Sequence, residues 1–141
     1  MGLGPWSVRW SVAGARYFNY YVGLMARREV PGQFEQIVLT AVLTLGSDAY
    51  GVSIFRRAQE LVAPRTVSLG AVYVTLDRME DKGYVTSWLS DPTPERGGRA
   101  KRRYKLQSSG EAALQESAAT ARRMWDAIAG ALGPDWLTAR N

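Results

Sequence analysis

The chain has 141 residues, which is about the length of one domain with appendages and too short for a second full domain. Hydrophobic residues make up 46% and charged residues 22%, a composition that excludes a disordered or collagen-like chain. The 18 Lys and Arg exceed the 13 Asp and Glu, and the net charge of +5 favours a polyanionic partner such as nucleic acid or an anionic membrane surface.

The absence of two residue types excludes several functions. The sequence has no cysteine and no histidine, so thiolate nucleophiles, the usual general base and the commonest metal ligands are missing. The tight acidic cluster of Asp77, Glu80 and Asp81 has Arg78 and Lys82 beside it, which favours ordinary surface ion pairs. We therefore expect no catalytic residue, no metal site, no cofactor and no enzymatic activity. No apolar run approaches the roughly 18 residues of a membrane-spanning helix, and we expect a cytoplasmic protein.

Residues 1–31 form an extension with its own composition. It has no acidic residue before Glu29, and its aromatic residues are Trp6, Trp10, Tyr17, Phe18, Tyr20 and Tyr21. Their spacing is compatible with an amphipathic helix, whereas the apolar core of a secretory signal is missing. Three interpretations stay open: an interfacial or partner-binding helix, an arm that covers the main domain, or sequence upstream of a true start at Met25.

Two helices are predicted after the break at Pro31 and Gly32. Apolar residues at intervals of three and four predict the first helix over 33–45, ended by Gly46. The second helix is predicted over 50–61, with Ser47 or Asp48 as its cap and Pro64 after its end. The face expected to be buried consists of Tyr50, Ile54, Ala58 and Leu61.

A third helix begins at Ser68, whose side chain can cap the first turn while Val67 and Val72 form a hydrophobic staple. Its inward face is expected to consist of Leu69, Val72, Leu76 and Met79. The opposite, exposed face would then carry Gly70, Ala71, Tyr73, Val74, Thr75, Asp77 and Arg78. The helix is expected to stop at Lys82 and Gly83.

Alternating residues predict strands over 84–89 and 103–107, joined by a long polar loop with a basic tip. A final helix is predicted from a capping box at Ser108–Glu111 to about Leu132, ended by Gly133 and Pro134. Its apolar residues step by three and four, as in a helix seam that packs against a partner: Leu114, Ala118, Ala121, Trp125, Ile128 and Leu132. The alternative is that this stripe packs back onto its own domain.

The order of these elements predicts a mainly α, α+β fold: a winged helix-turn-helix with a two-stranded wing and a long C-terminal dimerisation helix. Residues 32–107 would form the DNA-binding domain, 108–133 the dimerisation helix and 134–141 a tail. In such folds the second helix of the pair enters the major groove by its N-terminal end, and the wing contacts the backbone. The candidate DNA-binding residues are Ser68, Gly70, Ala71, Tyr73, Thr75, Arg78, Arg96, Arg99, Lys101 and Arg102.

From Gly32 to about Leu114 the chain resembles the PadR family of bacterial transcriptional regulators. The motifs that carry the resemblance are Phe34–Gln36, Asp48–Val52, Val67–Tyr73, Leu76–Glu80, Lys82–Gly83, Pro94–Arg99 and Arg103–Leu106 followed by Gly110. The aromatic extension before Met25 is not part of the family's usual pattern. The resemblance implies a homodimer that binds double-stranded DNA at a pseudo-palindromic operator and usually represses transcription. In short members of the family a cavity between the two C-terminal helices can accept a small aromatic effector, and the resemblance would make Trp125 its stacking surface. The small neighbours Ala118 and Ala121 leave room either for such a ligand or for close contact between the two helices.

Two other functions stay open at this stage. The tryptophan-rich, acid-free extension would suit a protein that associates with a membrane surface. A winged helix can also bind RNA, and the net charge does not distinguish the two nucleic acids.

Overall fold

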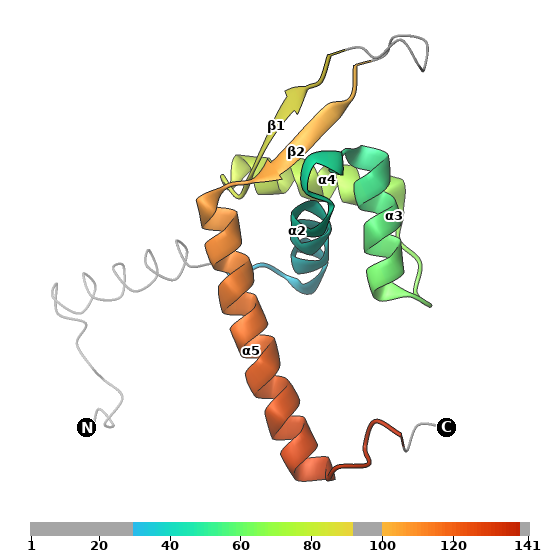
Figure 1. Ribbon diagram of the computed structural model, residues 1–141, viewed down its shortest axis with the longest axis vertical. Coiled ribbons are helices and arrows are strands. Elements are labelled where there is room, and N and C mark those ends of the chain that lie inside the picture. The colour runs from blue at the N-terminus through green and yellow to red at the C-terminus, as the bar shows by residue number, and fades with distance from the viewer. Residues whose placement is uncertain (1–29, 92–99, 139–141) are drawn as a thin grey trace, which may run out of the picture. The chain divides into compact units, whose positions relative to one another are not determined.

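The computed structural model describes residues 30–91 and 100–138. The chain divides into two units, of which the second is Pro31–Asn141. Its elements, in chain order, are α2 (Gln33–Leu45), a short 3-10 helix η1 (Gly46–Asp48), α3 (Gly51–Val62), α4 (Leu69–Asp81), β1 (Val85–Leu89), β2 (Arg102–Leu106) and α5 (Ser108–Leu132) (Figure 1). Each helix and strand predicted between residues 33 and 132 is confirmed, and the observed bounds differ from the predicted ones by one residue at most.

Two sets of predictions fall outside the described residues. The helix expected within residues 1–31 is one of them, together with the interpretations that depend on it. The loop tip is the other, including Arg96, Arg99 and the two glycines between them.

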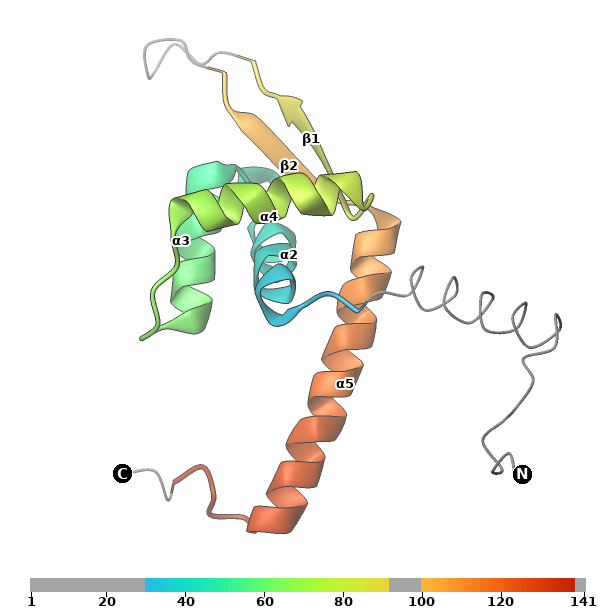
Figure 2. The same cartoon turned by 180° about the vertical axis from the view of Figure 1, so that it is seen from behind.

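The core lies where α2, α3 and α4 meet the base of the two-stranded sheet (Figures 1 and 2). Its largest fully buried side chains are Val38, Leu39, Ile54, Val72, Leu76 and Met79. Burial of each such side chain contributes about 1.5–3 kcal/mol, so these six residues are the main source of stability of the helical part. Because α4 is one wall of this core, its opposite side is left for contact with other molecules.

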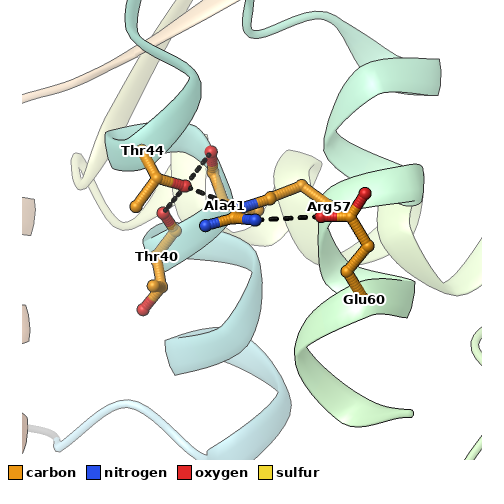
Figure 3. A network of polar contacts seen from close by, with 5 residues as sticks. All are labelled: Thr40, Ala41, Thr44, Arg57 and Glu60. Carbon is orange, nitrogen blue, oxygen red and sulfur yellow. Dashed lines mark hydrogen bonds and ion pairs between the residues drawn. The ribbon is translucent and has the colours of Figure 1, made fainter. Parts of the chain in front are cut away.

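Polar contacts fix α3 against α2 on the surface (Figure 3). The hydroxyl of Thr44 donates to the backbone carbonyl of Thr40 at 2.9 Å and accepts from Nε of Arg57 at 3.2 Å. The same guanidinium pairs with Glu60 at 2.9 Å. These groups are solvent-exposed, so the network orients the two helices more than it stabilises them.

The cap predicted for the second helix is wrong. Neither Ser47 nor Asp48 caps α3, because both belong to the intervening turn η1 and Tyr50 occupies the cap position. Ser53 in the first turn replaces them: its Oγ accepts from the backbone N–H of Tyr50 at 3.0 Å. Leu61 was expected on the buried face and is exposed, because it lies in the last turn of α3.

The cap predicted for α4 is confirmed. The Oγ of Ser68 accepts a hydrogen bond from the backbone N–H of Ala71 at 3.1 Å. The turn before it is held by Gln59, whose side-chain amide accepts from the N–H of Val67 at 2.9 Å and donates to the carbonyl of Arg65 at 2.6 Å. The direction in which α4 leaves this turn is therefore set by α3.

The two strands pair antiparallel, with Val85 opposite Leu106 and Leu89 opposite Arg102. The second strand is also joined to the connection between α2 and α3. The N–H of Tyr104 donates to the carbonyl of Ala49 at 2.9 Å, and Tyr50 and Arg103 form an isolated bridge. The wing is thus attached by backbone hydrogen bonds to the residues that precede α3.

The start of α5 packs closely against the end of α4 and the sheet. A capping box at Ser108 is not formed, since Gln107 occupies the cap position and no side chain bonds to it. Ser109 instead donates from its Oγ to the carbonyl of Gly83 at 2.7 Å. Gly110 is buried, and a Cβ there would lie 3.0 Å from Cδ2 of Leu106.

Candidate nucleic-acid interface

The outward face of α4 carries most of the residues predicted to read DNA. Ser68, Gly70, Ala71 and Tyr73 are exposed, as expected. The prediction that Thr75 is exposed is wrong, since this residue is only 4% exposed. It follows Val72 by three positions and therefore lies on the same inward side of the helix. Leu69, expected to be buried, is exposed in the first turn. The inward stripe is therefore rotated slightly from the one that the apolar spacing indicated.

Tyr73 has a defined position over the start of α3. Its ring lies against Gly51, where a Cβ atom would come within 2.6 Å of the ring carbon Cε1. The side chain of Tyr73 is nevertheless 40% exposed. A glycine at the first position of α3 therefore leaves room for the outer end of the Tyr73 ring, hydroxyl included, beside the start of this helix.

A groove of about 560 Å³ opens beside Tyr73, between the start of α3, α4 and the loop end of the wing. We call it the interface groove, and it is lined by Tyr50, Gly51, Val52, Arg56, Tyr73, Ala100, Lys101 and Arg102. Three of these side chains are cations and none is acidic, which is the electrostatic character expected of a phosphate contact.

Two cations of the interface groove are held in place by neighbouring side chains. The Nζ of Lys101 lies 4.0 Å from the centre of the Tyr50 ring, a cation–π contact. The Nη1 of Arg102 donates to Oγ of Ser87 at 2.9 Å, and Ser87 in turn donates to Oε1 of Glu80 at 2.7 Å. These contacts reduce the freedom that the two long side chains would lose on binding a phosphate.

Arg78 lies on the other flank of α4. Its Nη1 is 3.6 Å from Oε1 of Glu35, and Nζ of Lys82 is 3.4 Å from the same oxygen. The second carboxylate oxygen of Glu35 accepts from the N–H of Gly32 at 3.2 Å. The carboxylate thus joins the start of α2 to the end of α4, and it places Arg78 toward α2 rather than toward the wing.

Three residues near the predicted interface, Tyr50, Arg56 and Val74, are not among the candidate DNA-binding residues from the sequence. Tyr50 and Arg56 line the interface groove, although neither lies on the helix expected to read DNA. Val74 is 58% exposed in the middle of α4. The apolar spacing of the sequence predicts Val74 on this outward face, but a single valine carries no charge or hydrogen-bonding group that would mark it as a DNA contact.

Burial raises the pKa of the Tyr104 hydroxyl above its ordinary value of 10.0, and the nearby carboxylate of Asp77 acts in the same direction. Arg102 lowers the pKa of this hydroxyl and only partly offsets those effects. Tyr104 is therefore a neutral part of the wing base at neutral pH, below the cations that line the interface groove.

The predicted dimerisation seam on α5 divides into two parts. Leu114 is partly buried against the core, whereas Ala118, Ala121, Trp125, Ile128 and Leu132 are exposed. The alternative that the whole stripe packs back onto its own domain is therefore wrong in this chain. Trp125 contacts Trp136 of the tail edge-to-face, with ring centres 4.9 Å apart.

Residues 30–91 and 100–138 contain no group of three or more acidic side chains that could hold a metal ion. No helix within those ranges is both long and apolar enough to cross a membrane.

The three-helix core, the two-stranded wing and the outward-facing α4 define the class of winged helix-turn-helix DNA-binding proteins. A family model described as the transcriptional regulator PadR-like family matches residues 39–116, which is more than half of the chain. The chain belongs to this family, and it is a DNA-binding transcriptional regulator. The family is one of regulators and not of enzymes. No curated protein sequence matches the chain.

Solved structures share the fold. A PadR family transcription regulator from Clostridium difficile R20291 has a TM-score of 0.60 and 24% identity, over 72% of this chain and 100% of that one. A PadR family regulator from Eggerthella lenta has a TM-score of 0.53 and 17% identity, over 85% and 96% of the two chains. Bordetella bronchiseptica BpsR, described with the regulation of its DNA binding by 6-hydroxynicotinic acid, has a TM-score of 0.58 and 17% identity, over 92% of each chain.

Proposed function

We propose that this regulator binds a pseudo-palindromic operator as a homodimer and represses transcription from it. The observation that carries the proposal is the position of Tyr73 on the outward face of α4, directly beside the cations of the interface groove. A helix that reads bases and a groove that holds a phosphate are the two parts that sequence-specific binding needs. In this proposal residues 32–107 bind DNA and 108–133 form the dimer.

The exposed half of α5 supports the dimer. Trp125 is 49% exposed and Leu132 is 66% exposed, and Met124 and Ile128 beside them are also exposed. An apolar stripe of this length on one helix is costly in water and matches the seam of a two-helix interface. A two-fold axis between two copies of α5 would give the protein the symmetry of a pseudo-palindromic site.

A small aromatic effector remains part of the proposal. Trp125 offers a flat aromatic ring. Because its contact with Trp136 is edge-to-face, the two rings are not stacked face to face on each other. BpsR, which has the same fold, is described with an aromatic acid that regulates its DNA binding. An effector between two copies of α5 would change the distance between the two DNA-binding domains.

The experiment that tests the proposed function compares three polyanionic partners. Wild-type protein is titrated into a labelled duplex carrying a site selected from a random library, and RNA duplex of equal length and anionic vesicles are added as competitors. We expect the selected duplex to bind tightly and the competitors to displace it only at far higher concentration. Displacement by RNA at equal concentration would assign the protein to RNA, and displacement by vesicles would assign it to a membrane surface.

A further inference from the structure

Val74 points directly away from the core of the protein. It is two positions from the buried Val72 and two from the buried Leu76, and each residue of an α-helix turns the chain by about 100°. Val74 therefore lies about 200° from both, at the middle of the outward face. Gly70, one turn earlier on the same line, has open space where a Cβ would be. With no side chain at Gly70, the start of α4 does not protrude, and the short side chain of Val74 can come close to another surface.

The cations near α4 lie to either side of this outward line. On one side are Lys101 and Arg102 of the interface groove, and on the other is Arg78 beside Glu35. The line itself carries Gly70, Val74 and Asp77, none of which can neutralise a phosphate. A helix in the major groove, which is about 12 Å wide, has base edges in front of it and a phosphate backbone on each side. The distribution of charge around α4 matches this geometry, with Val74 against the base edges.

We propose that Val74 contributes to sequence specificity by packing against the methyl group of a thymine in each half-site. The inference rests on the proposed function, since it requires α4 to lie in the major groove. A valine has no hydrogen-bonding atom, and the C5 methyl of thymine is the apolar group that a base pair presents in the major groove. Val74 therefore selects for thymine by burying that methyl, and it gives no comparable gain at the other bases.

The test replaces each thymine of the selected duplex, one at a time, by deoxyuridine, which pairs identically and lacks only the methyl group. Wild-type protein, Val74→Ala and the control Leu61→Ala are compared. Leu61 is likewise an exposed apolar residue, but it lies in the last turn of α3. Both substitutions are at exposed positions and are not expected to disturb the fold.

For the wild type and the Leu61→Ala control, deoxyuridine at one position of a half-site should weaken binding about fourfold, which corresponds to one buried methyl group. Val74→Ala should bind the thymine and deoxyuridine duplexes equally well. The inference is overturned if Val74→Ala retains the fourfold difference or if no thymine of the operator is sensitive in the wild type. If the wild type binds no duplex at all, the proposed function fails as well, which distinguishes the two failures.

Discussion

Gly51 and Tyr73 form a packing pair in which the glycine of α3 makes room for the ring of α4. A Cβ at Gly51 would lie 2.5 Å from Cζ of Tyr73, far inside van der Waals contact. The two residues come from different helices, and the pair sets the direction in which the tyrosine hydroxyl points. The orientation of a side chain that we propose to read DNA thus depends on a residue that does not itself need to touch DNA.

Gly51→Ala is therefore expected to displace Tyr73 and to reduce sequence discrimination. Loss of a base contact costs about 1–3 kcal/mol, so we expect about tenfold weaker binding to the selected duplex and little change on a random duplex. Tyr73→Ala should give the same pattern, because it removes the hydroxyl that Gly51→Ala displaces. Gly130→Ala is the control, since a Cβ at Gly130 meets open space. Equal losses on both duplexes would mean that Tyr73 contacts the backbone or only packs.

Salt dependence provides a second prediction. If each subunit neutralises three or four phosphates, the logarithm of the dimer's affinity should fall with the logarithm of salt concentration with a slope of about −5 to −7. Arg102→Ala should reduce the magnitude of this slope by about 2, one phosphate per subunit. Arg122→Ala, an exposed cation on α5, is the matched control and should leave the slope unchanged. Titrations at four or more salt concentrations measure it, and a slope near zero would contradict the proposed phosphate contacts.

Trp125→Glu should abolish the dimer. The substitution would bring a carboxylate from each subunit into an apolar interface without a partner, and removal of charges from water costs several kcal/mol. Light scattering should then give the mass of one chain, 15.6 kDa, in place of twice that mass. The far-UV circular dichroism should stay unchanged, because Trp125 is exposed within one chain. A mass that does not change on substitution would place the dimer interface elsewhere.

The raised pKa of Tyr104 predicts a loss of stability in alkali. Its pKa in the folded state lies above that in the unfolded state, so its contribution to stability is complete below pH 10.0 and is lost as the pH rises through that value. The loss approaches about 1.4 kcal/mol per pH unit between the two pKa values. Urea unfolding at pH 9 and pH 10.5 should show that wild type loses stability relative to Tyr104→Phe. A constant difference between the two proteins would contradict the assignment.

Local patterns in the sequence predicted most of the fold. The spacing of apolar residues located α2, α4 and α5, and the hydroxyl of Ser68 before an apolar run marked the start of α4. These features depend on residues close together in the chain, so they can be read from sequence. The cap of α3 was missed because η1 adds a turn after α2 and moves the helix start beyond Ser47.

The candidate site was predicted less completely, since it is built from contacts between distant residues. No pattern indicates that Gly51 lies under Tyr73, that Lys101 stacks on Tyr50 or that Glu35 holds Arg78. Thr75 shows the same limitation at shorter range. As a polar residue it was assigned to the exposed side, yet its angular position beside Leu76 places it in the core.

The hydrogen bond from Tyr104 to Ala49 and the bridge between Tyr50 and Arg103 have a mechanical consequence. They fasten the hairpin to the residues that lead into α3, and Gly51 of α3 in turn positions Tyr73. The hairpin and α4 are therefore both tied to the start of α3, which constrains the distance between them. In the proposed complex, a duplex whose groove does not match that distance would have to deform, so the stiffness of the DNA would contribute to the affinity.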